Sequence, residues 1–132
     1  MRARHYTELI VWQLADEIRR QVFAWTRREP LSREHKRRAQ FEDAIDSVCR
    51  NVSEGFPGTH AEFAWFLEVA RRSLNEVSDC LRSAQLKGFI SESEAAPVYA
   101  KSRRLHRGIA RLIDHLRRTP DPPRRPGKPS AR

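Results

Sequence analysis

The chain of 132 residues is long enough for one domain with one hydrophobic core. Hydrophobic residues make up 39% of it and charged residues 33%, so the chain can fold but must expose a strongly charged surface. Glycine is scarce, with 5 residues, and Asn-Gly and Asp-Gly hairpin signals are missing from the sequence, which argues against a β-sheet fold and favours an all-α fold.

The net charge of +9 comes from the last quarter of the chain. Residues 1–99 hold 15 basic and 15 acidic residues, which cancel. Residues 100–132 hold 11 basic residues against Asp114 and Asp121 alone. The basic excess therefore belongs to one segment and is not spread over the surface.

The longest apolar run covers residues 9–15, far below the roughly 20 residues of a membrane-spanning helix. It ends at Asp16 and Glu17 without the small-residue cleavage site of a signal peptide. We therefore expect a cytoplasmic protein without membrane contact. Cys49 and Cys80 are expected about 20 Å apart on neighbouring antiparallel helices, too far for a disulfide, and free thiols suit a reducing compartment.

A first amphipathic helix is predicted from Thr7 to about Arg28, before Pro30. Thr7 is a suitable N-cap, and Glu8 beside it suits the positive end of the helix dipole. Five apolar residues then recur at steps of four and three, which places them on one helical face: Val11, Ala15, Ile18, Val22 and Trp25.

A second helix is predicted from an N-cap at Ser32 to Ser53 or Glu54, with Gly55 in the left-handed conformation at C′. Its core stripe is apolar: Phe41, Ile45, Val48 and Val52. Beside it runs a second stripe of mostly small or polar residues, here called the polar seam: Gln40, Ala44, Ser47, Asn51 and Glu54.

The polar seam, together with Gly55, is assigned a structural role in preference to a ligand-binding one. Two structural alternatives stay open: the seam lines an interface between subunits, or it forms an intramolecular network with the third helix, for example with Ser73. Because the helix dipole disfavours an anion at a helix C-terminus, Glu54 is expected to have an arginine or backbone N–H groups as its partner.

Two capping boxes mark the starts of the third and fourth helices. Thr59 is followed three residues later by Glu62, and Ser91 by Glu94. Gly88 is expected at the C′ position of the third helix. Both helices carry an apolar face: Phe63, Phe66, Leu67, Ala70, Leu74, Val77, Leu81 and Ala84 in the third, and Val98, Leu105, Ile109, Leu112 and Leu116 in the fourth.

Four helices with short connections predict an antiparallel up-down-up-down four-helix bundle over residues 1–118. Thr119-Pro120 ends the fourth helix. Residues 119–132 are rich in proline and arginine and hold no hydrophobe larger than alanine, so a disordered basic tail is predicted there.

Motifs for catalysis are missing from the sequence. A di-iron bundle needs Glu-x-x-His pairs, and the chain has none, nor a phosphate loop, a Gly-x-Ser-x-Gly or a dinucleotide fingerprint. Cys49 and Cys80 have no histidine at helical contact spacing. We therefore predict no enzyme, no metal and no cofactor. An enzyme that uses Asn51 and Glu54 is the weakest alternative.

A basic surface is the candidate functional site. Arg104, Arg107, Arg111 and Arg118 form one stripe of the fourth helix, with Arg103 beside it, opposite the apolar face. Four further arginines are assigned to the same role, two in the second helix and two in the tail: Arg37, Arg38, Arg124 and Arg125. A solvated helix face and a solubilising tail are the plainer explanation, but almost no acids compensate these arginines, and their forked donors suit phosphate. We predict sequence-tolerant binding to the backbone of RNA or DNA.

The aromatic residues favour core packing with one exception. Trp65 lies off the apolar stripe of its helix, so it is either an exposed interface anchor or an edge tryptophan that covers the bundle end. The other aromatics considered are assigned to the core: Trp12, Trp25, Phe63 and Phe66.

Three motifs in order resemble a bacterial four-helix-bundle family named after proteins encoded in 23S rRNA intervening sequences. They are residues 9–15, Leu-Ile-Val-Trp-Gln-Leu-Ala, residues 40–55, which end in Asn-Val-Ser-Glu-Gly, and residues 62–74, which begin Glu-Phe-Ala-Trp-Phe-Leu. Residues 87–90, Lys-Gly-Phe-Ile, also fit the loop before the last helix of the family. The resemblance covers about residues 6–117.

The resemblance implies an antiparallel bundle that assembles as a homopentamer. A related branch, the accessory proteins of diversity-generating retroelements, binds nucleic acid and works with a reverse transcriptase. This chain departs from the family where Pro57-Gly58 replaces a glycine followed by a basic residue, and mildly at Val52-Ser53. The predicted function is a non-enzymatic, oligomeric nucleic-acid-binding accessory protein. The alternative is a protein–protein scaffold whose basic face docks an acidic partner, such as a reverse transcriptase complex.

Overall fold

A computed structural model describes residues 3–121 of the chain. Four long helices account for most of them: α1 (Ile10–Thr26), α2 (His35–Gly55), α3 (His60–Leu86) and α4 (Glu92–Arg118). Two short 3-10 helices, η1 (Tyr6–Glu8) and η2 (Leu31–Arg33), precede α1 and α2. No strand occurs within these residues, so the prediction of an all-α fold with four helices is confirmed.

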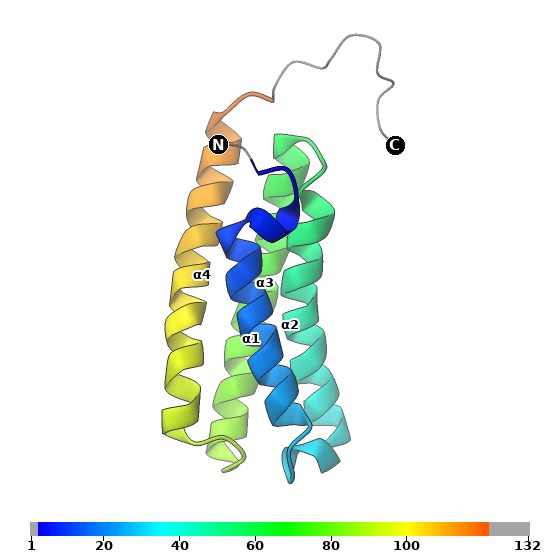
Figure 1. Cartoon of the computed structure of the whole chain (residues 1–132), viewed down its shortest axis with the longest axis vertical. Coiled ribbons are helices and arrows are strands. Elements are labelled where there is room, and N and C mark those ends of the chain that lie inside the picture. Colours follow the sequence, from blue (N-terminus) through cyan, green and yellow to red (C-terminus); the bar gives the residue numbers. More distant parts are fainter. Residues whose placement is uncertain (1–2, 122–132) are drawn as a thin grey trace.

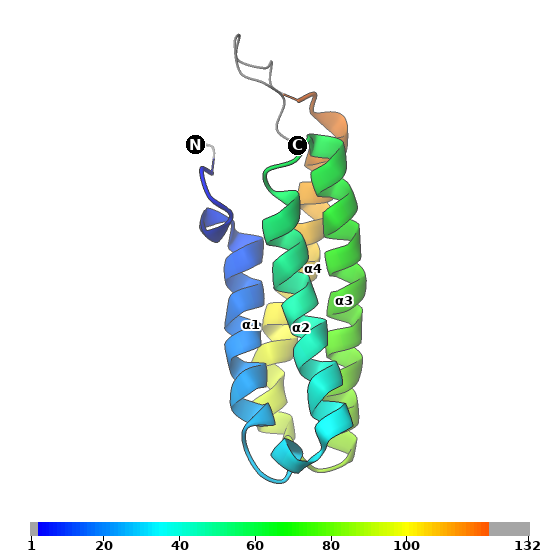
Figure 2. The ribbon, with the colours of Figure 1, turned by 90° about the vertical axis from the view of Figure 1, so that its right-hand side faces the viewer.

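The four helices lie side by side, and their connections alternate between the two ends of the bundle (Figures 1 and 2). Each helix packs against two neighbours, in the cyclic order α1, α2, α3, α4. The apolar stripes predicted from the spacing point inward and form a single core. Its largest fully buried side chains come from all four helices and from η2: Ile18, Leu31, Phe41, Ile45, Leu67, Leu74, Leu81, Leu105 and Ile109.

Both predicted capping boxes are confirmed. The N–H of Glu62 donates to Thr59 Oγ1 over 3.1 Å, and the N–H of Thr59 donates to Glu62 Oε1 over 3.1 Å. Ser91 and Glu94 repeat this exchange at the start of α4 over 3.1 and 3.0 Å. Gly88 has a φ of 79°, as predicted for the residue that follows the C-cap of α3.

The predicted starts of the first two helices are wrong. Thr7 lies inside η1, which is capped by His5, and α1 begins after Leu9 without a side-chain cap. Ser32 lies inside η2, and α2 begins at His35, again without a side-chain cap. In both cases the residue predicted as the N-cap lies inside a hydrogen-bonded 3-10 turn that precedes the α-helix.

The left-handed conformation predicted for Gly55 is also wrong. Gly55 is the last residue of α2, and Gly88 is the glycine with positive φ among residues 3–121. The reason for a glycine at this point is a close approach between helices. A Cβ atom at Gly55 would lie 2.6 Å from Phe66 Cβ and 2.9 Å from Phe63 Cδ1, closer than carbon atoms pack.

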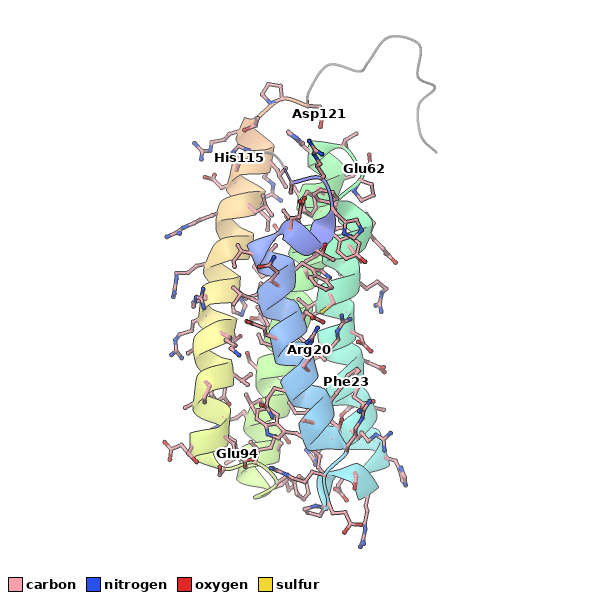
Figure 3. The ribbon with its side chains drawn as sticks, viewed as in Figure 1. Arg20, Phe23, Glu62, Glu94, His115 and Asp121 are labelled. Atoms are coloured by element: carbon pink, nitrogen blue, oxygen red, sulfur yellow. The ribbon has the colours of Figure 1, made fainter. Side chains whose placement is uncertain are left out.

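Polar contacts fasten both ends of the bundle. At the end where α4 begins, the Arg28 guanidinium pairs with the Glu94 carboxylate and donates to the carbonyl oxygen of Phe89 over 3.0 Å. At the other end, the N–H of His60 donates to the Asp121 carboxylate over 2.7 Å. Figure 3 shows Glu94 and Asp121 at these opposite ends.

Candidate nucleic-acid interface

The outer face of α4 carries four arginines that we call the arginine face: Arg103, Arg104, Arg107 and Arg111. They follow from the amphipathic pattern of the helix, whose opposite face is buried in the core through Leu105, Ile109 and Leu116. All four arginines are exposed, and none makes an ion pair or side-chain hydrogen bond within residues 3–121. The arginine face therefore presents four uncompensated guanidinium groups to solvent.

The end of α4 differs from the arginine face because its arginines have acidic partners. Arg118, predicted as part of the same stripe, pairs with Asp114 over 2.7 Å. Arg117 reaches across to Glu68 on α3 over 3.1 Å. Arg118 remains exposed, but part of its charge is offset by its neighbour on the helix.

The structure places Arg37 and Arg38 away from the arginine face, at the start of α2. The Arg37 guanidinium donates to the Ser83 hydroxyl on α3 and lies 6.0 Å from the ring centre of Phe89. Arg38 lies 3.4 Å from the Glu42 carboxylate. Arg37 joins α2 to α3 and Arg38 pairs with an acid of its own helix, so we leave both out of the interface proposed below.

Arg124 and Arg125 lie outside the described residues. The segment predicted as a tail nevertheless begins with a contact to the bundle. Thr119 accepts at its carbonyl oxygen 2.8 Å from His60 Nδ1, and Asp121 accepts from the His60 N–H. The carboxylate of Asp121 thus satisfies an amide at the N-terminus of α3, where the helix dipole favours an anion.

The polar seam forms a network inside the subunit. Ser47 lies 2.7 Å from the hydroxyl of Ser73 on α3, the partner predicted for the intramolecular alternative. Asn51 is buried and donates to the carbonyl oxygen and the hydroxyl of Ser47, over 2.7 and 3.1 Å. Gln40, at the start of the seam, is exposed. Ser47 therefore connects α2 to α3, and Asn51 supports Ser47 from within α2, whereas the subunit-interface alternative stays a prediction.

The partner predicted for Glu54 is not found. Its side chain is exposed and makes no ion pair or hydrogen bond to any of residues 3–121. Solvation explains this result, because water screens an exposed carboxylate from the helix dipole and no protein partner is then required.

The aromatic residues divide as the helix spacing predicts. Trp25 and Phe63 are buried, whereas Trp12 and Phe66 are half-buried against the core. Trp65 is 63% exposed and meets the Phe66 ring edge-on, with 5.1 Å between ring centres. Trp65 is thus the large aromatic side chain that remains open to solvent on α3.

Residues 3–121 contain no cluster of three or more side chains that could hold a metal ion. Burial raises the pKa of the Cys49 thiol to about 12, and the pKa of Cys80 is also raised, chiefly by burial. Both thiols are free and stay protonated near neutral pH, which makes them poor nucleophiles.

One part of the surface was not found by sequence reasoning. A cavity of about 550 Å³ lies between α3 and α4 and is lined by Ser78, Arg82, Gln85, Glu92, Ala96, Tyr99 and Arg103. The lining residues of each helix are spaced by three or four, which is the available sequence signal. That signal is weak, because the pairing of the two stripes depends on how α3 and α4 pack.

No helix within residues 3–121 has the length and apolar character needed to cross a membrane. A comparison with curated proteins finds no match. A family model described as 23S rRNA-intervening sequence protein matches residues 7–111, which include all four members of the arginine face. Since this match spans more than half of the sequence, the chain belongs to the 23S rRNA-intervening sequence protein family.

Proposed function

We propose that the protein is a non-enzymatic accessory protein that binds the phosphate backbone of RNA or DNA through the arginine face of α4. The observation that carries the proposal is the set of four exposed guanidinium groups on one helix face without an acidic partner in the described chain. A solvated helix face ordinarily mixes both signs of charge, as α3 does with Glu68 and Arg71.

Arginine suits this role because its planar fork donates two parallel hydrogen bonds to a phosphate. Phosphate contacts fix position and carry no base information, so the proposed binding is sequence-tolerant. The basic residues of the tail, such as Arg124 and Arg125, would add to the same field.

The proposal includes assembly into a homopentamer, of the kind the family resemblance implies, from subunits that are antiparallel up-down-up-down bundles. The alternating connections of the helices support that arrangement. In a pentamer the arginine face is repeated five times, so that modest contacts add up to useful affinity. A place in the cytoplasm belongs to the same proposal. Size-exclusion chromatography with light scattering measures the subunit number directly.

The test compares binding of a structured RNA across a salt series. Engagement of about five phosphates predicts a log–log salt slope of about −4 to −5. In a triple variant, Arg104→Ala, Arg107→Ala and Arg111→Ala, we expect weaker binding and a slope less negative by about 2 to 3, because three phosphate contacts are lost.

The matched control removes the same charge elsewhere, through Arg20→Ala, Arg33→Ala and Arg72→Ala. These side chains are exposed on other faces of the molecule. The control is expected to keep most of the salt slope. Equal losses in both triple variants would show that net charge alone drives binding, and a salt-independent binding curve would rule out backbone recognition.

A protein–protein scaffold is the second candidate, and Trp65 favours it. An exposed tryptophan is costly to hydrate and is enriched at the centres of protein interfaces. If Trp65→Ala changes the subunit number or abolishes capture of a defined acidic partner while RNA binding is unchanged, Trp65 serves an interface between proteins.

A further inference from the structure

We propose that the groove between α3 and α4 seats a single-stranded segment of nucleic acid, with a phosphate held between Arg82 and Arg103. This inference rests on the proposed function and extends it by naming the class of ligand and a second helix that contacts it. Arg82 lies on α3, outside the arginine face.

The groove brings together two arginines from different helices. Arg82 of α3 and Arg103 of α4 line the same cavity of about 550 Å³, and both are exposed. Neither makes an ion pair or side-chain hydrogen bond to another residue of the described chain. The two guanidinium groups repel one another across this shared space, and an anion between them relieves that repulsion.

Two residues that line the groove are joined by a hydrogen bond between the helices. The Tyr99 hydroxyl of α4 donates to Gln85 Oε1 of α3 over 2.7 Å. This bond fixes the ring, which lines the cavity and is half-buried. Ala96, one turn before Tyr99, also lines the groove and fills little of it because its side chain is small. The groove therefore offers an aromatic surface next to two cations, the combination that single-strand binding sites use.

The shape of the groove favours a single strand over a duplex. Its lining on α4 runs from Glu92 to Arg103, about 16 Å at 1.5 Å per residue. A single strand can place a phosphate between the arginines and turn a base toward Tyr99. A duplex keeps its bases stacked inside and presents mainly phosphates, which can bind to the arginine face without entering the groove.

Glu92 lines the same cavity, so a change of its charge provides a second test of phosphate binding there. A carboxylate beside a bound phosphate is unfavourable, and Glu92 also lies in the first turn of α4, where it suits the helix dipole. Removing this charge should therefore tighten binding of a single strand while slightly weakening the helix. Tighter binding cannot arise from a damaged fold.

The experiment measures binding of a single-stranded thymidine oligonucleotide and of a duplex of equal length to the full chain. In Arg82→Ala we expect about tenfold weaker binding of the single strand and less than about twofold for the duplex. Glu92→Gln should strengthen single-strand binding by about two- to threefold. The matched control is Arg72→Ala, an exposed arginine of α3 outside the groove, with less than about twofold effect on either ligand.

Equal effects of Arg82→Ala on the two ligands, or equal effects of Arg82→Ala and Arg72→Ala, would overturn the groove while leaving the arginine face intact. No binding of either oligonucleotide by the unmodified chain would overturn the groove and the proposed function together. Circular dichroism melting of each variant confirms that the compared proteins are folded.

Discussion

Gly55 and Phe66 bring α2 and α3 into contact at the level of their backbones. A Cβ atom at Gly55 would lie 2.6 Å from the Cβ of Phe66, an atom that no rotamer change can move away. The α2–α3 contact at this end of the bundle therefore depends on the missing side chain.

We expect Gly55→Ala to lower the free energy of unfolding by about 1–3 kcal/mol, the usual range for overpacking. Chemical denaturation measures the change. If there were space for the methyl group, Gly55→Ala would instead raise the free energy of unfolding by up to about 1 kcal/mol, because alanine favours the helix over glycine. A stabilised variant would show that α2 and α3 are not in close contact here.

A structural feature is predicted well from the sequence when the residues that determine it are close together in the chain. The capping boxes at Thr59 and Ser91 were predicted correctly because each is complete within four residues. The sequence predicts the end of the second helix near Gly55 correctly but not the reason for the glycine, because its close neighbour Phe66 lies on another helix. Thr7 and Ser32 are suitable N-caps by residue type, but both lie inside 3-10 helices.

The candidate site follows the same rule. Arg104, Arg107 and Arg111 are found by helical spacing on one element, and the structure shows them exposed. Arg37 fits the same composition, yet its contact with Ser83 lies 46 residues away and is invisible in the sequence. The sequence does not single out Arg82, because Arg82 and Arg103 line one cavity only when α3 and α4 pack side by side.

The Arg28–Glu94 ion pair predicts a dependence of stability on pH. Hydrogen bonds from Arg28 and from the N–H of Ser91 lower the pKa of Glu94 from 4.5 to about 2. A carboxylate with a lowered pKa in the folded state stabilises above its unfolded value, and this contribution is lost as pH falls toward 2. The melting temperature of Glu94→Gln should therefore be below that of the unmodified chain at neutral pH, and the difference should vanish near pH 2.

Glu94→Gln is a suitable change because glutamine keeps the capping box with Ser91 and removes only the charge. In Arg28→Gln, a nuclear magnetic resonance titration should show the Glu94 pKa moving up toward 4.5. An unchanged Glu94 pKa in that variant would mean that the ion pair is not formed in solution.

The hydroxyl pair of Ser47 and Ser73 predicts non-additive effects on stability. Removing one hydroxyl should lower the free energy of unfolding by about 1 kcal/mol, because its partner is left without the bond. Removing both should lower it by less than the sum of the single changes. Urea denaturation of the two single alanine variants and the double variant measures the coupling, and strictly additive values would contradict a direct bond.

The two thiols should differ in their reactivity. Cys49 is buried with a pKa of about 12, whereas Cys80 is half-buried. With a small disulfide reagent in mildly alkaline buffer, we expect Cys80 to react first and Cys49 to react at least about tenfold more slowly. In Cys80→Ser, the fast phase should disappear and only the slow phase of Cys49 should remain. Two fast phases of equal rate would contradict the burial of Cys49.

The Arg28–Glu94 pair also bears on the order in which the bundle folds. Of the four neighbouring helix pairs, α1 and α4 are the pair that no connection joins. Arg28 and Glu94 are 66 residues apart, and Gly108 lies close enough to Val11 that a Cβ atom there would be 3.0 Å from it. Contacts between distant residues carry the largest loop-closure entropy. We therefore expect the helical hairpins to form first and α4 to dock on α1 in the final step, which leaves the part of α1 that faces α4 uncovered until the bundle closes.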